Sequence, residues 1–587
     1  MSQYNIVKTD ILIIGAGLAG LNAAYEAALL GSEVTVICKG SASASPEVMG
    51  FNAPIHPDDS PELFYEEIMK SGQMLNRSGL AHRLAHESME QVYRMEKLGV
   101  PFAKNPDGTY NGMKALGNSY PRIAHFKALT GAESVGILRK QAKALGVKFV
   151  EHTRAVDLLS DEAEVYGCLS LDDENHMVVF QSKCTILACG GLSNMHTIST
   201  YPKGLIGDGY AMAAKAGAEM VDMEFTQFEP CCIVHPQSLW GKLIVTTMLN
   251  EGGKLLNNKG EEFMKNNEKG YKMQKSELSR AIVEEIRSGG GTEHGGVWMD
   301  VTALPHDRVA IDNSIFYDPP KREGIDITEV PVEVAPAAHT FMGGVRINEN
   351  CESSLNGLLA AGEVSGGIHG ANRLGGCAGA EVFVFGCIAG RQAHEVASVR
   401  NICTDKALRI ADALAGRYEN LPQTTTVTEE ELALYATLKA DIAAGLGIYR
   451  SEGEMNTCLE KLGQHEKALA DGRIKDVQLK INCENIILVA RMQLLASLKR
   501  KESRGVLART DYPLLDDENW KKNIIVSFEN DGICLRIEDM PVLLLTKANN
   551  PSTVRRQAFL PVWAAPGAKT ADIQMDPNCL PLLFLSC

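Results

Sequence analysis

The sequence predicts an α/β fold built on a nucleotide-binding domain of the Rossmann type, and three observations support this. A strand, a glycine turn over Gly15–Gly20 and a helix follow one another near the N-terminus. Two later strands, Cys184–Leu187 and Leu358–Gly362, also run into glycines. Residues 235–340 lie between these two strands, which is long enough to form a separate inserted domain.

The N-terminal unit carries the clearest pattern. Asp10–Ile14 is a continuous apolar run, typical of a buried parallel strand, and Glu33–Cys38 reads as the next strand. The glycines allow a tight turn that directs the N-terminus of a helix over Leu21–Leu30 toward a pyrophosphate. The acidic residue that ordinarily binds a ribose after the second strand is absent, because Cys38 stands there.

Further along, Gly207–Gly209 opens a helix predicted over Tyr210–Gly217, and residues 401–510 read as helical, for example Ile481–Lys499. The tail alternates like strands over Ile524–Phe528 and Ile533–Ile537. We therefore expect a nucleotide-binding domain in two parts (1–234 and 341–400), an inserted α+β domain (235–340), a helical domain (401–510) and a small C-terminal domain (511–587).

Composition excludes several classes of protein. A chain of 587 residues exceeds one compact core, and a net charge of -15 argues against nucleic-acid binding. No apolar run approaches the ~20 residues of a membrane span and no export signal is read, so we expect a cytoplasmic protein without a membrane span. The 15 cysteines follow neither an iron–sulfur nor a haem spacing, so we expect free thiols and no metal site.

A second glycine-rich segment, Gly366–Gly376, places His369 and Arg373 where backbone can approach a flat ligand closely. With the other blocks, it resembles the flavoprotein subunits of succinate dehydrogenase and fumarate reductase, with L-aspartate oxidase as a relative. The resemblance implies FAD, a capping domain over the flavin, a helical domain and a C-terminal domain. The matching blocks are Gly15–Gly20, Leu187–Gly191, Gly207–Gly209, Glu224–Pro230, Glu251–Gly253, Ser279–Ile286, His339–Gly344, His369–Gly375 and Glu502–Pro513.

The glycine turn and the resemblance together give a set of expected FAD contacts. The family attaches FAD covalently through a His in a Ser-His-Thr segment. The corresponding stretch here is Ser41–Gly50, with Ala44 or a neighbour in that place and no His before His56, so we expect non-covalent FAD. The expected cofactor-binding residues are Gly15, Gly17, Leu18, Ala19, Gly20, Cys38, Lys39, Gly50, Ala155, Gly190, Asp208, Glu363, His369 and Ala378.

For the substrate, the resemblance implies three catalytic residues. Arg280 matches the arginine that protonates the substrate carbon, although it could instead pair with Glu284 on its own helix. His339 and Arg373 match the pair that holds one substrate carboxylate, with contact to an FAD phosphate or to backbone as the alternative. The forked guanidinium of an arginine can bind a carboxylate through two parallel hydrogen bonds.

The departures from the family concern the other end of the substrate. Glu229 replaces the His of Gln-Phe-His-Pro, and Val245–Thr246 replaces Thr-Glu. At ~4 Å, an unpaired Glu229 would repel a second substrate carboxylate by a few kcal/mol, unless it is paired with a cation or protonated. Val506–Arg509 departs from Ala-His-Ala-Arg, and Thr246 replaces the proton-relay Glu. Asp222, Glu224 and Glu251 are substitute relay candidates that also fit structural roles.

We therefore expect an FAD-dependent oxidoreductase that reduces a C=C bond beside a substrate carboxylate, with fumarate and succinate as poor substrates. Electrons would come from a separate iron–sulfur or ferredoxin-like subunit in a hetero-oligomer. The alternatives are an oxidase of the L-aspartate oxidase type, an adenylylsulfate-reductase-like alpha subunit or a flavin-holding assembly subunit. The apolar Leu580–Leu585 could be a docking edge or a core strand.

Overall fold

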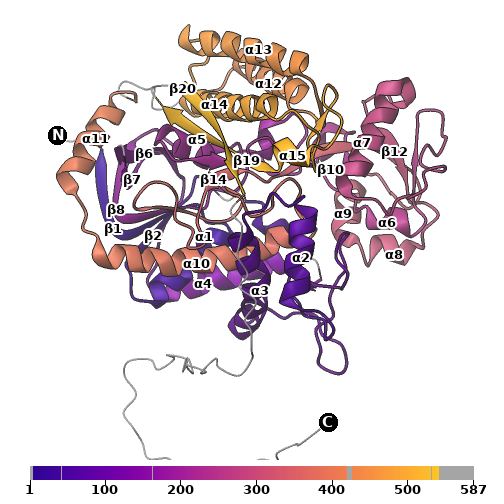
Figure 1. Cartoon of the computed structure of the whole chain (residues 1–587), viewed down its shortest axis with the longest axis horizontal. Helices are drawn as coiled ribbons and strands as arrows, with labels where there is room; N and C mark the ends of the chain where they lie inside the picture. The colour runs from indigo at the N-terminus through magenta and orange to yellow at the C-terminus, as the bar shows by residue number, and fades with distance from the viewer. Residues whose placement is uncertain are drawn as a thin grey trace, which may run out of the picture. The chain divides into compact units, whose positions relative to one another are not determined.

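The structure, a computed structural model, describes residues 4–40, 43–127, 129–161, 163–418, 426–529 and 532–540. The predicted Leu580–Leu585 segment, most of the predicted C-terminal domain and the pair 41–42 lie outside these residues. The fold is α/β, as predicted, with a capping sheet and a C-terminal sheet beside the nucleotide-binding sheet (Figure 1).

The main sheet has seven strands in the order β5-β2-β1-β8-β7-β6, with β15 beside β8. The central pairs β2-β1-β8-β15 are parallel, whereas β8-β7-β6 is an antiparallel meander. Ile11 to Ile14 of β1 are at most 5% exposed, as expected for a strand covered on both faces. The strands are β1 (Asn5–Ile14), β2 (Val34–Ile37), β5 (Lys148–Val150), β6 (Thr153–Asp161), β7 (Glu164–Asp172), β8 (Met177–Leu187) and β15 (Leu358–Ala360).

Helices α1 (Leu18–Leu29), α4 (Thr130–Ala144) and α10 (Cys377–Val399) lie together along this sheet (Figure 1). A Cβ at Gly386 of α10 would lie 2.7 Å from the carbonyl oxygen of Ala19, so the glycine lets α10 and α1 approach closely. The predicted helix after the glycine turn is confirmed, but it starts at Leu18 because Gly17 is itself the N-cap. Nearby lie α2 (Pro61–Ser71), α3 (Ser78–Leu98), β3 (Gly50–Asn52), β4 (Ile123–His125) and α5 (Asp208–Lys215).

The inserted region forms an antiparallel sheet, β10-β13-β12-β11, with its own hydrophobic core around Ile233, Ile282 and Val334. Its first strand begins at Thr226, before the predicted boundary at residue 235, because β10 pairs with β13. The other predicted domain boundaries stay predictions. The elements are β10 (Thr226–Ile233), α6 (Thr247–Asn250), β11 (Lys254–Leu256), α7 (Lys275–Glu285), β12 (Val297–Asp300), α8 (His306–Ala310), α9 (Ser314–Arg322) and β13 (Val332–Phe341).

The predicted helical region holds α11 (Thr404–Ala415), α12 (Glu429–Gly445), α13 (Glu452–Ala470) and α14 (Val477–Lys499). Among the described residues, α14 alone is long and apolar enough to span a membrane, but 67% of its most apolar stretch is buried inside the protein.

The two predicted tail strands are confirmed as β19 and β20 of a sheet ordered β16-β14-β9-β19-β20. Its strands are β9 (Met220–Val221), β14 (Gly344–Arg346), β16 (Ser365–Gly366), β19 (Lys522–Glu529) and β20 (Gly532–Asp539). The remaining short elements are β17 (Tyr449–Arg450), β18 (Ala508–Arg509) and α15 (Asp517–Trp520).

Candidate active site

A cavity of about 1780 Å³ opens at the carboxyl ends of the parallel strands and reaches the capping sheet. Crevices at that edge are where open α/β sheets bind their ligands. One part of the lining comes from the turns after β1, β2, β8 and β15, and the other from β10, α7 and β13. Most of the residues predicted for cofactor and substrate therefore share one continuous space.

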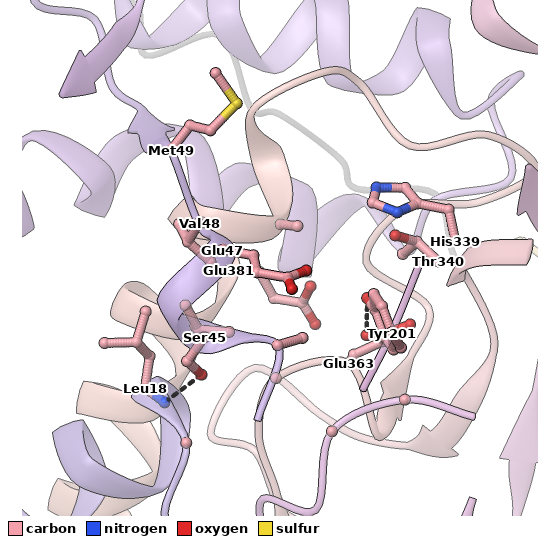
Figure 2. A pocket seen from close by; sticks show the side chains of 18 of the residues that line it. Leu18, Ser45, Glu47, Val48, Met49, Tyr201, His339, Thr340, Glu363 and Glu381 are labelled. Atoms are coloured by element: carbon pink, nitrogen blue, oxygen red, sulfur yellow. Dashed lines mark hydrogen bonds between the residues drawn. The ribbon is translucent and has the colours of Figure 1, made fainter. Parts of the chain in front are cut away.

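The turn after β1 forms a cradle that only glycine allows. Gly15 has a φ of +120°, and a Cβ there would lie 2.1 Å from the carbonyl oxygen of Ala188. The N-terminus of α1 opens on the cavity, and the N–H of Leu18 donates to Ser45 Oγ at 2.9 Å (Figure 2). Gly15, Gly17, Leu18 and Ala19 line the cavity. Gly20 does not: its missing Cβ leaves room for the Gly15 carbonyl, 2.0 Å from where a Cβ would stand.

Eight of the other predicted cofactor residues line the same part of the cavity, namely Cys38, Lys39, Gly50, Ala155, Gly190, Asp208, Glu363 and Ala378. Asp208 accepts hydrogen bonds from Lys39 at 2.5 Å and from Arg154 at 2.7 Å. Although burial opposes ionisation, these two cations hold the pKa of Asp208 well below its usual range. Sequence reasoning missed Arg154, which also lines the cavity.

His369 does not line the cavity, which corrects its predicted role as a direct cofactor contact. It is 4% exposed, and its Nε2 lies 2.9 Å from Glu381 Oε2. Glu381 does line the cavity, and its Oε1 is buried without a hydrogen-bond partner. The orphaned oxygen and the glycine cradle fit a ligand rich in hydroxyl and N–H groups, as FAD is. His369 therefore reaches the cavity only indirectly, by holding the Glu381 side chain that lines it.

Glu363 lies between the two parts of the cavity. It accepts hydrogen bonds from the Tyr201 hydroxyl at 2.5 Å (Figure 2) and from the N–H of Phe341 at 3.0 Å. Burial raises the pKa of Glu363 to about 7, despite both donors. Its charge therefore changes near neutral pH.

The structure brings His339 and Arg373 together at the end of the cavity under the capping sheet. Arg373 Nη2 donates to Gln227 Oε1 at 2.9 Å, while its Nε is buried with no partner. His339 Nδ1 lies 2.8 Å from Thr200 Oγ1. Burial, helped by the cations of Lys275 and Arg373, lowers the pKa of His339 well below its usual value, so the imidazole is neutral at pH 7. Arg373 and His339 therefore both have nitrogen atoms left to donate hydrogen bonds to a bound anion.

Glu229 reaches the same end of the cavity but carries a partner. Its side chain is 2% exposed, and its Oε2 lies 2.5 Å from Lys275 Nζ and 3.9 Å from His339 Nε2. Lys275 opens α7, where Gln274 and Glu277 form a capping box that fixes the first turn. In the structure Glu229 is therefore paired with a cation, Lys275. Lys275 is a functional candidate that the sequence did not reveal.

Arg280 does not line this cavity, so its predicted contact with the substrate stays a prediction. Its Nη1 donates to the carbonyl oxygen of Gly505 at 3.3 Å. Lys275 and Arg280 are five residues apart on α7, and a helix turns by about 140° over that interval. Because Lys275 faces the cavity, Arg280 points elsewhere. Its alternative partner Glu284 accepts a hydrogen bond from Tyr449 instead.

The three relay candidates lie in ion pairs or hydrogen bonds of their own. Asp222 accepts from Asn523 at 2.7 Å, and Glu224 accepts from Arg500 at 2.7 Å, both buried and off the cavity. Glu251 lines the cavity but is paired with Arg308. Val245 and Thr246 also line it, as predicted for the altered end. Arg509, from the altered C-terminal motif, binds Asp511 away from the cavity.

Comparison with known proteins agrees with this geometry. A family model described as an FAD binding domain matches residues 10–378, and one described as the fumarate reductase flavoprotein C-terminus matches residues 436–555. The chain belongs to the succinate dehydrogenase and fumarate reductase flavoprotein family. It is therefore an FAD-dependent oxidoreductase of the kind that acts on CH–CH groups.

Members of this flavoprotein family resemble the chain over most of its length. A CoM/CoB fumarate reductase polypeptide of Methanothermobacter marburgensis is 33% identical, over 89% of this chain and 98% of the relative. An L-aspartate oxidase of Clostridium acetobutylicum is 30% identical over 70% and 93%. The solved E. coli quinol fumarate reductase superposes with a TM-score of 0.85 at 26% identity, covering 93% of this chain and 99% of that one.

Proposed function

We propose that this flavoprotein reduces a C=C bond beside a single carboxylate, on a substrate other than fumarate. The observation that carries the proposal is the charge at the capped end of the cavity. Arg373 and Lys275 are cations, Glu229 is an anion paired with Lys275, and His339 is neutral. These four residues together carry one net positive charge, which matches one carboxylate.

Among the described residues, a second carboxylate has no unpaired cation to meet at this end of the cavity. Lys275 could bind it only by leaving Glu229 at 2.5 Å, and Glu229 is 2% exposed. Breaking a buried ion pair by removing one partner costs about 3–5 kcal/mol, because the other charge stays buried. Fumarate would meet that cost, whereas a 2-enoate with an uncharged far end would not.

FAD would be held by the glycine cradle, by Glu381 and by the Lys39–Asp208–Arg154 cluster. Bound there, it would supply hydride transfer at its N5 atom. We infer that attachment is non-covalent, because Ala44 lines the cavity at the place where the family carries its histidine. An alanine side chain has no atom that could form such a bond.

The chain's own residues would bind the carboxylate and move a proton. The Arg373 guanidinium, with its unpaired Nε, would anchor the carboxylate beside neutral His339. The Lys275 ammonium would deliver the proton to the substrate carbon, a role the sequence had given to Arg280. Glu229 would hold the Lys275 ammonium in place. After the transfer, solvent would reprotonate Lys275, since its side chain is 30% exposed.

Electrons would come from a separate iron–sulfur or ferredoxin-like subunit in a hetero-oligomer in the cytoplasm. In support, relatives are named as subunits of fumarate reductases. Within the described part of the chain, the groups of close-lying metal-ligand side chains contain no cysteine. The proposal therefore requires a partner protein that carries an iron–sulfur cluster.

The test is anaerobic reoxidation of the photoreduced enzyme by a panel of 2-enoates. A monocarboxylic 2-enoate should reoxidise the flavin, and fumarate should do so at least about tenfold more slowly at equal concentration, which corresponds to about 1.4 kcal/mol. Saturable fumarate reduction below a millimolar would overturn the proposed specificity while leaving the flavoprotein assignment intact.

An oxidase of the L-aspartate oxidase type is the second candidate. Glu229 favours it, since a carboxylate near the substrate could accept the ammonium of an amino acid in place of Lys275. Hydrogen peroxide formed during aerobic turnover of an amino acid, with no reoxidation by any 2-enoate, would select this reading over the first.

A further inference from the structure

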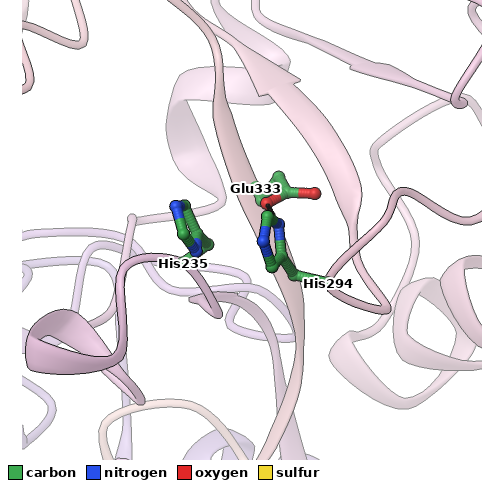
Figure 3. Close-up of side chains that lie close together, drawn as sticks. All are labelled: His235, His294 and Glu333. Atoms are coloured by element: carbon green, nitrogen blue, oxygen red, sulfur yellow. Dashed lines mark hydrogen bonds and ion pairs between the residues drawn. The ribbon is translucent and has the colours of Figure 1, made fainter.

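Three side chains outside the large cavity lie close enough together to bind one metal ion. They are His235, His294 and Glu333, and one donor atom from each lies within 4.8 Å of the others (Figure 3). Glu333 is on β13, His235 follows β10 and His294 precedes β12. Because β13 pairs with both β10 and β12, the sheet itself brings the three together.

Glu333 is a buried carboxylate that needs a positive charge nearby. It is 4% exposed, and among the described residues its side chain is paired with no lysine or arginine. Its hydrogen-bond partner is Nδ1 of His294, at 2.6 Å. Buried carboxylates are ordinarily paired or bound to a metal, and an imidazole 40% exposed to water is a weak source of charge.

A second imidazole lies beside the first. The rings of His235 and His294 are stacked, with centroids 3.8 Å apart and an angle of 16° between their planes (Figure 3). The His235 ring therefore adds a second imidazole beside the one that contacts the Glu333 carboxylate, and imidazole nitrogen is a common metal ligand.

We propose that His235, His294 and Glu333 bind a divalent transition-metal ion of the Zn²⁺ class. Two nitrogen donors and one carboxylate oxygen are the donors that Zn²⁺ accepts, with water in the fourth position. Donor atoms around a tetrahedral zinc lie about 3.4 Å apart, so His294 Nδ1 and Glu333 must separate from 2.6 Å, and the exposed His235 ring must turn out of the stack to point a nitrogen at the ion. The ion replaces the proton that now joins His294 to Glu333.

None of the three residues lines the large cavity, so the ion would lie outside the proposed reaction. His294 belongs to the loop between α7 and β12, which also contains Gly291, Gly295 and Gly296. Bound metal would fix that loop and the chain after β10 to the central strand of the capping sheet. The inference is independent of the substrate proposed above.

The test uses the full-length, FAD-loaded protein, stripped of metal with a chelator. Zn²⁺ is then titrated against a chromophoric competitor, and Co²⁺ gives a visible spectrum that reports its geometry. We expect one tight equivalent of Zn²⁺ and a tetrahedral Co²⁺ spectrum. The variants H294A and E333Q should weaken binding at least about tenfold, since each removes one of only three protein ligands.

The variant H176A is a matched control, because Asp172, Glu174 and His176 form a comparable group that is more exposed. It should bind Zn²⁺ as the unmodified protein does. FAD absorbance per chain shows whether each variant is folded, and H235A offers a milder change should E333Q fail that check. Zn²⁺ binding that is absent from the unmodified protein, or that survives in both H294A and H235A, would overturn the proposal.

Discussion

At the scale of single residues, the capped end of the cavity contains the predicted Glu229, and this residue is paired with Lys275. Sequence reasoning found Glu229, His339 and Arg373 because each stands inside a recognisable block. It missed Lys275 because pairing with Glu229 joins positions 46 apart, and the rotation of α7 decides which side chain faces inward. A pattern of residue types does not fix that rotation.

Replacing Lys275 with alanine should lower the rate of substrate reduction by about 10²–10⁴-fold, as removal of a general acid does. The flavin should still be reduced by dithionite, since the change is confined to the proton. Stopped-flow reoxidation with a monocarboxylic 2-enoate measures the effect. Arg280→Ala is the matched control on the same helix and should stay within about threefold of the unmodified rate. The reverse order would return the acid role to Arg280.

Arg373→Lys should raise KM more than it lowers kcat, because an ammonium cannot reproduce the forked guanidinium that anchors a carboxylate. We expect a loss in kcat/KM of about 2–3 kcal/mol, the range of charge-assisted hydrogen bonds. Steady-state kinetics with the best 2-enoate provides the measurement. A fall in FAD content with an unchanged KM would place Arg373 on the cofactor instead.

Glu363 should make stability depend on pH. Its pKa is raised to about 7 in the folded protein, so the folded state holds its proton more tightly than the unfolded state. Its contribution is therefore favourable at pH 5 and declines as the pH rises through 7. Tm measured from pH 5 to pH 8 should fall more in the unmodified protein than in E363Q, where the contribution is absent. Asp222, whose pKa is also about 7, is common to both proteins and cancels. Parallel Tm profiles would contradict this.

At the scale of elements, local signals predicted β1, the glycine turn and α1 well, because strand burial and turn geometry depend on neighbouring residues. The pairing of α1 with α10 depends on contacts between residues more than 350 apart in sequence, and no local signal reveals it. The structure explains it by small residues: at Gly386 and Gly390 a Cβ would lie 2.7 and 2.5 Å from backbone oxygens of α1.

Gly386→Ala should therefore lower Tm and FAD content together, because the added carbon pushes α10 away from the helix whose N-terminus opens on the cavity. Overpacking of this kind costs about 1–3 kcal/mol. Gly136→Ala in α4 is the control: nothing lies within 4 Å of its Cβ position, so it should leave Tm unchanged or raise it. Thermal unfolding and flavin fluorescence measure both. Equal responses would mean that the close approach is relaxed easily.

At the scale of the whole molecule, the order of domains followed from the resemblance, but the charged contacts between them did not. Arg500 is fully buried, with its Nε 2.7 Å from Glu224 and its Nη1 2.9 Å from Glu502. Glu224 lies 276 positions from Arg500 in the sequence, whereas Glu502 is two residues away, and each alone reads as a surface charge. Only the assembled fold shows that Glu224 joins distant segments through an ion pair.

Arg500→Ala should destabilise the protein by about 3–5 kcal/mol, since the buried Glu224 loses its ion-pair partner while Glu502 keeps Arg504. Urea unfolding followed by fluorescence measures this free energy. Arg491→Ala breaks the half-exposed pair with Glu466 and should cost no more than about 1 kcal/mol. Similar losses in the two variants would mean that the buried cluster is held by something other than this arginine.

The residues proposed to anchor the substrate and to protonate it come from different walls of the cavity, and turnover depends on both. Arg373, which would anchor the carboxylate, belongs to the nucleotide-binding wall, whereas Lys275, the proposed proton donor, and its partner Glu229 belong to the capping domain. In the proposed reaction the substrate would therefore be anchored from one wall and protonated from the other. Reduced flavin would turn over only where both walls contact the same substrate molecule.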